Sequence, residues 1–407
     1  MSLETSAPVA PHDAEGHVDP AATLAESARS GSHGPIQTRS ERPASFEPAD
    51  FGAPTGREVN WKHTPLAALA AVLDDRAGDE GAVEIAVTGP LAAASLRVGE
   101  SPRGEVFVPE DLPSAIAWQR STEALYLSIP AGEELAEPAV VDLRGTGSAL
   151  VAHSHIVIEA QPQARGTVIL RHAGSAAFAQ NVELIVRDGA ALTLVSVQEW
   201  DDDAVHAAAH QARVDKDAFL RHIVVSFGGG VVRINPTADL AGSGAEGELY
   251  GLAFADDGQH LESQVYLHHR GPQTRGDVLY KGALQGDTAR TVWIGDVLIG
   301  PDATGTDSYE ANRNLVLTPG ARADSIPNLE IETGDIRGAG HASATGRFDE
   351  EQLFYLQARG IPEAEARRLV VLGFLAEIVQ KVGDAELEER LMASVERELA
   401  ADAGQAR

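Results

Sequence analysis

The sequence predicts a mainly β protein in which a coil of short strands, a β-solenoid, lies between a mixed N-terminal domain and a helical C-terminal domain. Three observations support this fold class. From about residue 138 to residue 336, short apolar runs alternate with Gly, Asp, Asn and Pro, and no helix-period segment interrupts them. Within that region a short motif recurs at a nearly constant step. After residue 347 the apolar residues follow the 3.6-residue period of helices instead.

The N-terminal part is predicted as two segments. Residues 1–55 are rich in Pro, Ala, Ser, Gly and acidic residues with little periodicity, so we expect a mostly disordered tail. Residues 56–137 are expected to form an α/β domain of short strands and helices. Its first helix should begin at Thr64, a good cap residue, with Pro65 in the first turn and an apolar face that runs to Leu73. A further helix is expected near residues 112–119.

The region 138–346 is expected to be the solenoid core. A turn residue, then Ala, then an apolar run is found at Ala164, Ala190, Ala218 and Ala245, at intervals of 26, 28 and 27 residues, and Gln273 follows 28 residues later. A constant step with two or three short strands in each fits a coil in which every turn pairs with its neighbours. The aromatic content of 5% suits a narrow interior of small aliphatic residues. A β-sandwich or jelly roll is the alternative that the repeat leaves open.

Residues 347–407 are expected to form a helical domain of three helices. Asp349 and Gln352 have the spacing of a capping box at the start of the first helix. Gly360 ends this helix, and Pro362 begins the second. The third carries an apolar stripe at i+4 spacing, made of Leu387, Leu391, Val395 and Leu399. Such a stripe usually closes its own bundle, and it can also dock a partner helix.

Composition excludes several classes of partner and chemistry. The formal net charge of −29, from 32 basic and 61 acidic residues, argues against nucleic acid or an anionic membrane surface as partner. The absence of cysteine excludes a disulfide framework and any thiolate nucleophile or thiolate metal ligand from this chain. The N-terminus lacks the basic region and apolar run of a signal peptide, and no window holds 18 apolar residues. We therefore expect a cytoplasmic protein.

The usual signatures of catalysis are missing. The sequence contains no P-loop, no dinucleotide-binding glycine fingerprint between a strand and a helix, no nucleophile elbow and no HExxH pair. We therefore expect that the chain is not an enzyme. If its function uses ATP, another chain must hydrolyse it.

Three stretches gather acids or histidines. Residues 201–203 are consecutive aspartates before His206 and His210; we expect a solvated turn, and the two histidines would chelate a metal only on a helix. His153 and His155 share one face of a strand, which we expect to be an ordinary exposed polar face. The pair at residues 268–269 indicates little by itself.

His341 has a different setting, in the segment GAGHASATG, where the strand pattern gives way to helices. Its neighbours are too small to cover it, so another chain can approach closely. A neutral imidazole is a common ligand for iron, copper or zinc. One histidine cannot hold a metal alone, so the remaining ligands would have to come from a partner. The alternative is a structural turn residue.

Five pieces of the C-terminal third occur in a specific order and spacing. They are YKG at 280–282, RNLVLTPGARADSIPNLEI at 313–331, GH at 340–341, DEEQLFYLQARGI at 349–361 and GF at 373–374. In this order and spacing the chain resembles the SufB/SufD family of iron–sulfur cluster assembly proteins. VNWKHTPLAAL, from residue 59, is similar to the N-terminal start of the family, so the resemblance extends over residues 56–407.

The resemblance implies a right-handed parallel β-helix over residues 138–346. It also implies a complex in which a SufB-like and a SufD-like subunit pair through their β-helices, while SufC-like ABC ATPases bind the C-terminal helical parts. In the family the cluster is thought to form at the heterodimer interface, with a cysteine from the SufB-like and a histidine from the SufD-like subunit. This chain lacks cysteine and has Gly338-Ala339-Gly340 where many relatives have Cys-Ser before the histidine, so it resembles the SufD-type partner.

The expected function is a non-catalytic scaffold subunit of a SufBCD-type complex, with His341 beside a transient iron–sulfur cluster or iron at the subunit interface. When isolated, the chain can also form a homodimer. One alternative is a carbohydrate-active β-helix protein such as a lyase, although that class wants a secretion signal and an acidic calcium cluster along a groove. The other is a homodimeric structural solenoid without metal. Co-purification of an ABC ATPase and a cysteine-containing paralogue would support only the first.

Overall fold

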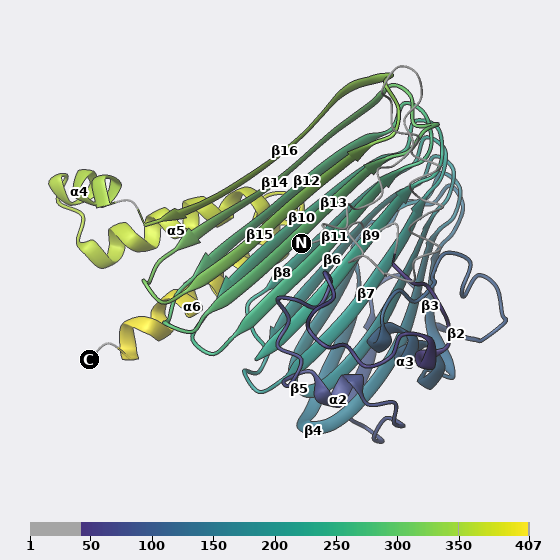
Figure 1. Ribbon diagram of the computed structural model, residues 1–407, viewed down its shortest axis with the longest axis horizontal. Helices are drawn as coiled ribbons and strands as arrows, with labels where there is room; N and C mark the ends of the chain where they lie inside the picture. The colour runs from purple at the N-terminus through teal and green to yellow at the C-terminus, as the bar shows by residue number, and fades with distance from the viewer. Residues whose placement is uncertain (1–41, 349, 406–407) are drawn as a thin grey trace, which may run out of the picture. The chain divides into compact units, whose positions relative to one another are not determined.

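The computed structural model describes residues 42–348 and 350–405. Its centre is a coil of strands that form two sheets (Figure 1). The odd sheet contains, in order, β15 (Arg322–Ile331), β13 (Arg290–Ile299), β11 (His260–His269), β9 (Val231–Leu240), β7 (Val205–Val214) and β5 (Arg165–Val186). The even sheet continues from β5 through β6 (Ala191–Trp200), β8 (Phe219–Ser226), β10 (Glu246–Ala255), β12 (Arg275–Leu284), β14 (Thr306–Val316) and β16 (Ile336–Arg347).

All pairings along this path are parallel, and after β5 each turn of the coil contributes one strand to each sheet. The predicted parallel β-helix is therefore confirmed, and the sandwich and jelly-roll alternatives are wrong. Four further strands precede the coil: β1 (Val83–Thr88), β2 (Ala94–Arg97), β3 (Glu123–Ile129) and β4 (Ala139–Ala160). Of these, β3 and β4 extend the parallel pairing, whereas β1 and β2 pair antiparallel with β4 and β3.

The alanines of the predicted repeat mark strand starts on the even side of the coil. The four alanines immediately precede β5, β6, β8 and β10 and are buried: Ala164, Ala190, Ala218 and Ala245. Parallel register stacks the first residues of these strands on one another, and Arg275 of β12 continues the stack. The fifth position of the repeat is therefore Thr274, one residue after the predicted Gln273. A small side chain is favoured there because the position lies in the narrow space between successive turns.

A glycine makes the corner between the two sheets possible in β5. Residues 165–174 of this strand pair with β6, and residues 177–186 pair with β7. Gly174 has φ of +75°, and a Cβ on it would lie 2.2 Å from the carbonyl oxygen of Gly145. Only glycine meets both conditions without strain.

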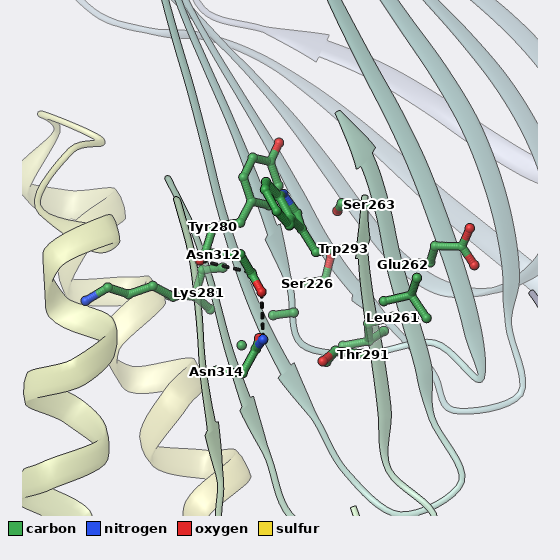
Figure 2. A pocket seen from close by; sticks show the side chains of 14 residues that line it. Ser226, Leu261, Glu262, Ser263, Tyr280, Lys281, Thr291, Trp293, Asn312 and Asn314 are labelled. Carbon is green, nitrogen blue, oxygen red and sulfur yellow. Dashed lines mark hydrogen bonds between the residues drawn. The ribbon is translucent and has the colours of Figure 1, made fainter. Parts of the chain in front are cut away.

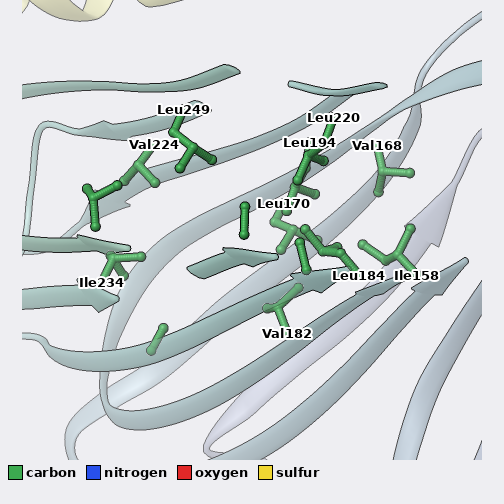
Figure 3. Packing of buried hydrophobic residues seen from close by; sticks show 14 of the residues in the cluster. Ile158, Val168, Leu170, Val182, Leu184, Leu194, Leu220, Val224, Ile234 and Leu249 are labelled. Carbon is green, nitrogen blue, oxygen red and sulfur yellow. The ribbon is translucent and has the colours of Figure 1, made fainter. Parts of the chain in front are cut away.

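Small and medium aliphatic side chains fill the space between the sheets (Figure 3). Leu170, Leu184, Leu194 and Leu220 are among the fully buried residues of this core. Because neighbouring strands lie only about 4.8 Å apart, equivalent positions of successive turns stack in rows. Each such side chain contributes roughly 1.5–3 kcal/mol when it leaves water, so the rows stabilise the coil turn by turn.

The N-terminal segment contains the short helices η2 (Pro48–Asp50), α2 (Ala70–Leu73) and α3 (Leu112–Arg120). The helix predicted near residues 112–119 is confirmed as α3, where the Asp111 side chain accepts a hydrogen bond from the backbone N–H of Ser114. The predicted helix start at Thr64 is wrong, because residues 65–69 form turns and only Ala70–Leu73 are α-helical. The hydroxyl of Thr64 instead donates to the carboxylate of Glu262, at 2.9 Å to Oε2.

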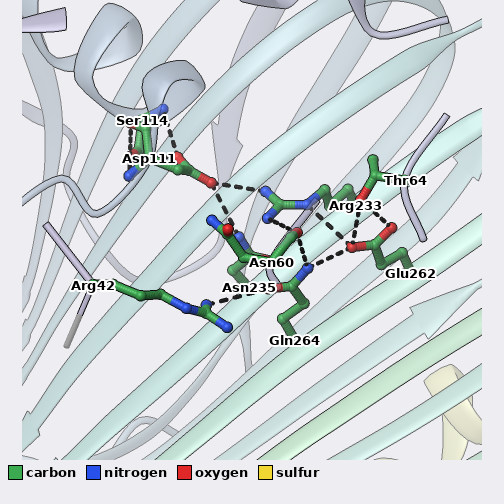
Figure 4. Close-up of polar contacts among 9 residues, drawn as sticks. All are labelled: Arg42, Asn60, Thr64, Asp111, Ser114, Arg233, Asn235, Glu262 and Gln264. Carbon is green, nitrogen blue, oxygen red and sulfur yellow. Dashed lines mark hydrogen bonds and ion pairs between the residues drawn. The ribbon is translucent and has the colours of Figure 1, made fainter. Parts of the chain in front are cut away.

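Buried charges join this segment to the outer face of the odd sheet (Figure 4). The Arg233 guanidinium is 1% exposed and contacts two carboxylates, Asp111 at 2.7 Å and Glu262 at 3.2 Å. Within the predicted tail, Arg42 donates to Gln264 at 3.3 Å. Residues 1–41 of that tail lie outside the described residues. The domain boundaries stay predictions.

The C-terminal segment contains three helices, as predicted: α4 (Glu350–Ala358), α5 (Glu363–Val379) and α6 (Ala385–Gln405). The predicted cap Asp349 lies outside the described residues. Gly360 and Gly383, with φ of +85° and +72°, lie in the links between the helices. The apolar stripe of α6 packs against the outer face of the even sheet, where it joins Val195, Ile223 and Phe254 in one buried cluster. The stripe therefore serves the fold of the chain itself.

Candidate metal-ligand site

His341 lies on β16, the last strand of the even sheet. Its backbone is in register with Glu310 of β14, and its side chain is 44% exposed. A methyl group added at Gly338 or Gly346 of the same strand would meet no atom closer than 3.5 Å. The imidazole therefore stands on a surface with little side-chain bulk, within the strand and not in the turn beyond it.

The two sheets end together in what we call the open end, formed by β15 and β16. No described strand pairs with the outer edge of either one. Their side chains are half-buried or exposed, whereas nearly all those of β13 are buried. Ser343 and Ser325 link the two strands through a hydrogen bond of 2.8 Å between their hydroxyls. Long edge strands of this kind are templates for pairing with another chain.

The inner side chains of β14 form a polar row beneath His341. The row consists of Thr306, Ser308, Glu310, Asn312 and Asn314, all buried. Its amides are well paired, because Asn312 donates to the Tyr280 carbonyl at 3.2 Å and Asn314 donates to Asn312 Oδ1 at 2.6 Å. The exception in the row is Glu310.

Glu310 is 1% exposed, and neither carboxylate oxygen has a hydrogen-bond partner among the described residues. Burial, together with the negative charge of Asp296, raises the pKa of Glu310 to about 8. The backbone N–H of Asn328 lies near enough to counter this slightly, but its geometry falls short of a hydrogen bond. On the neighbouring strand β16, the Nδ1 atom of His341 lies 3.9 Å from Glu310 Oε1.

A small polar hollow inside the coil is lined partly by the same row (Figure 2). Asn312, Asn314 and Thr291 contribute polar groups, and Tyr280 and Trp293 contribute aromatic rings. The Tyr280 hydroxyl and the Trp293 Nε1 find no partner among the described residues. A polar hollow with unsatisfied donors is the kind of interior space that holds ordered water.

The histidines predicted after the aspartate run lie inside the coil. His206 and His210 are on β7, a strand, so their i, i+4 spacing puts both on its inner face, where they are fully buried. They meet two histidines that sequence reasoning did not single out. His210 Nδ1 lies 2.9 Å from His222 Nε2, and the rings of His206 and His172 are 5.0 Å apart.

These four histidines are neutral groups of the interior. Burial lowers the pKa of His172 and of His222 to about 4. It also holds the pKa values of His206 and His210 well below the usual range, with the neighbouring histidines as a second cause. The preceding residues 201–203 are exposed in a turn, as predicted.

The exposed face predicted for residues 153 and 155 is wrong for His155. Its ring is buried between Phe107 and Trp118, with Nε2 3.2 Å from Glu183 Oε2. The N-terminal segment covers this face of β4, which the strand pattern alone does not reveal. His268 and His269 end β11: the first pairs with Asp239 at 3.1 Å, and the second is buried between Thr274 and Ser308.

No group of three or more His, Asp or Glu side chains in the described part of the chain is arranged to hold a metal ion. His341 is therefore placed as a single exposed imidazole with one carboxylate below it. Sequence reasoning missed that carboxylate. The signal was present in TDSYEANRN, residues 306–314, where every second residue is polar and a glutamate is one of the residues that point inward.

No described helix is both long and apolar enough to cross a membrane.

Comparison with known proteins gives a consistent picture. The family model described as SUF system FeS cluster assembly, SufBD core domain, matches residues 143–374, more than half of the chain. An iron–sulfur cluster assembly SufBD family protein of Mycobacterium bovis is 48% identical over 364 residues, which cover 88% of this chain and 92% of the relative.

Two further relatives show the range of the similarity. The iron–sulfur cluster assembly protein SufD of Escherichia coli is 26% identical over 385 residues, covering 86% of this chain and 90% of that protein. A second SufBD family protein of Mycobacterium bovis is 29% identical over 201 residues, covering 49% of this chain and 24% of the relative. One organism thus has two different SufBD family proteins that are similar to this chain.

Proposed function

The chain belongs to the SufBD family of SUF-system iron–sulfur cluster assembly proteins, and from this premise we propose that it is the SufD-type scaffold subunit of a SufBCD-like complex. In this role it catalyses nothing itself. It pairs with a SufB-like paralogue, binds a SufC-like ABC ATPase, and supplies His341 beside iron or a transient cluster at the subunit interface. The family assignment leaves the carbohydrate-active alternative without support.

Two features of the chain favour the SufD-type role. It contains no cysteine, so it has no thiolate with which to accept sulfur or to hold iron. Its similarity to SufD of Escherichia coli extends over 86% of its length, whereas the second Mycobacterium bovis protein matches only 49% of it. A partner of the second kind is a natural candidate for the cysteine-bearing subunit.

The observation that carries the proposal is the open end. The two edge strands β15 and β16 lack a described partner on their outer side, and His341 stands exposed on one of them. A SufB-like subunit that adds its own edge strands there would bring its ligands next to this imidazole. Small residues at 338 and 340 leave the backbone accessible to such an approach.

The ATPase contact is proposed for α4 and not for the stripe of α6. The stripe is buried in the chain's own cluster, whereas Phe354 and Tyr355 of α4 are 71% and 55% exposed. Two adjacent exposed aromatic residues on a helix are typical of a protein-binding surface.

Co-expression tests the complex directly. The tagged chain is expressed with a SufB-like paralogue and a SufC-like ATPase, and we expect all three to co-purify in size-exclusion chromatography. Ile331→Lys places a charge on the exposed part of β15 and should weaken recovery of the paralogue at least fivefold. Ile85→Lys, at a similarly exposed position on β1, is the matched control. If the chain elutes alone or only as a homodimer, the scaffold assignment is wrong.

A further inference from the structure

The carboxylate of Glu310 is buried inside the coil, and within the described part of the chain no hydrogen bond offsets the cost of removing it from water. An ionised carboxylate removed from water without hydrogen bonds is costly, and most buried polar groups in native proteins are paired. Here both oxygens stay without a donor among the described residues. A charged group in this state needs either a proton or a cation next to it.

The opposite sheet leaves room for this carboxylate. Gly295 of β13 faces it, and a Cβ on this residue would lie 2.5 Å from Glu310 Oε2 and 2.3 Å from the ring of Trp293. Any larger residue at 295 would displace the carboxylate or the indole. The space is therefore fitted to a glutamate, and the Trp293 ring forms part of its wall.

Among the residues that the structure describes, His341 is the only side chain at ion-pair distance from this carboxylate, with Nδ1 3.9 Å from Oε1. Two ligands of one metal ion with bonds of about 2.1 Å stand roughly 3.0–3.4 Å apart in octahedral or tetrahedral geometry. The gap is slightly wider than this, and the imidazole is 44% exposed, so a small rotation of the ring would close it. One ligand is buried, and the other is partly exposed on β16 at the open end.

We propose that Glu310 and His341 form a two-ligand half-site for ferrous iron, in which the buried carboxylate fixes the ion and the imidazole faces the partner subunit. This inference rests on the proposed role of His341 and adds a second ligand to it. Carboxylate and imidazole together suit Fe(II), whereas a chain without cysteine has no thiolate ligand for softer ions. With only two protein ligands the site stays open to water and to a partner's groups, as cargo iron that is passed on requires.

The test uses the isolated full-length chain and Fe(II) alone, under anaerobic equilibrium dialysis with iron quantification. We expect wild type to retain about one iron per chain, and we expect Glu310→Gln and His341→Ala each to weaken binding at least tenfold. Asp307→Asn, at an exposed position of the same strand, is the matched control and should bind as wild type does. Glu310→Gln keeps the shape and removes the charge, so without metal its melting temperature should equal or exceed that of wild type. Added Fe(II) should raise the melting temperature of wild type and of Asp307→Asn only.

The outcomes separate this inference from the proposed function. If Glu310→Gln binds Fe(II) as wild type does, or if wild type binds none, the half-site is wrong. His341→Ala is also assayed for iron in the complex with its partner. Loss of iron there, with no effect of Glu310→Gln in either assay, would overturn the half-site and leave the scaffold role of His341 standing. Retention of iron by the His341→Ala complex would instead remove the proposed role of His341.

Discussion

Arg233 is the residue on which the seam between the N-terminal segment and the coil depends. Its guanidinium lies between Asp111 at the start of α3 and Glu262 of β11, and it stacks 4.0 Å from the ring centroid of Trp61. Burial alone would raise the pKa of Glu262, but the hydrogen bond from His260 and the charge of Arg233 hold it at about 2. The same cation lowers the pKa of Asp111 against the effect of burial.

Arg233→Met is predicted to cost about 3–5 kcal/mol of unfolding free energy, because it leaves two carboxylates buried without their cation. Arg290→Met is the control: its guanidinium pairs with Asp324 but is 32% exposed, so the loss should stay below about 1 kcal/mol. Urea titration at pH 7 measures both. Equal losses in the two variants would contradict this account of the seam.

The same network gives a pH dependence with a definite sign. The pKa values of Glu262 and Asp111 are lowered in the folded chain, so their contribution is complete above about pH 4.5 and is lost as the pH falls toward 2. The ionised forms of Glu262 and Asp111 therefore stabilise the contact between the N-terminal segment and the coil. Glu310 differs from them, because its environment raises its pKa and favours the neutral form.

At the scale of elements, the inner faces of β5, β7 and β8 hold a cluster of buried histidines. His172 and His222 have folded pKa values of about 4, below the value of about 6.5 expected in the unfolded chain. Their contribution to stability is therefore complete above about pH 6.5 and is lost as the pH falls through 4. These strands should make the coil sensitive to acid before Glu262 and Asp111, whose pKa values are lowered, are protonated.

His222→Gln should reduce the loss of unfolding free energy between pH 6.5 and pH 4.5, because one group that takes up a proton only on unfolding is removed. The variant will have lower stability at pH 7, so the slope against pH is the quantity to compare. His268→Gln, whose ring is partly exposed beside Asp239, is the control. Denaturant titrations across this pH range measure the slope of unfolding free energy against pH. An unchanged slope in His222→Gln would contradict the explanation by buried histidines.

The C-terminal helices separate a structural face from a proposed binding face. Leu391→Ala on α6 removes a fully buried side chain from the cluster on the even sheet and should cost about 2–5 kcal/mol. Phe354→Ser with Tyr355→Ser should leave the melting temperature within a few degrees and weaken ATPase binding at least tenfold. Thermal melts and titration calorimetry with the ATPase test the pair. Unchanged ATPase affinity in the α4 double variant would show that α4 is not the contact.

Sequence patterns predicted elements well where a local signal determines the structure. The alanine repeat identified the turn of the coil, because each turn needs a small residue at the same stacked position. The predicted helix start at Thr64 was wrong because its hydroxyl binds Glu262, nearly two hundred residues away, instead of capping a helix. The predicted exposure of His155 was wrong because α3 and the loop before it cover that face of β4. In each failure, a distant contact outweighed a local preference.

The candidate site was predictable only in its exposed half. Small residues around His341 in the sequence predicted an open imidazole, and the structure places it so. Glu310 belongs to the preceding turn, and only the register of β14 with β16 brings it beneath the histidine. A single sequence does not give that register. The stripe of α6 was equally ambiguous, because the pattern of an apolar face does not say whether its partner is the same chain or another.

At the scale of the whole molecule, the two ends of the coil differ. Its first turns are covered by the N-terminal segment, whereas β15 and β16 have no described strand on their outer edges. This difference suits the proposed scaffold role. The covered first turns stabilise the fold, and the edges of β15 and β16, which no described strand pairs with, are available to a partner subunit. The proposed contacts with paralogue, iron and ATPase all lie in the last hundred or so residues of the chain.

The iron content of the assembled complex tests most directly whether His341 holds iron at a subunit interface, as proposed. Wild-type, His341→Ala and His268→Ala chains are each purified anaerobically with the SufB-like and SufC-like partners, and iron and sulfide are quantified per complex. His268→Ala replaces a partly exposed histidine on β11 that pairs with Asp239, and it serves as the control. We expect equal assembly of all three complexes, with iron and sulfide in the His341→Ala complex reduced to less than half of the wild-type amounts. A His341→Ala complex that carries as much iron and sulfide as wild type would show that this histidine is only a strand residue.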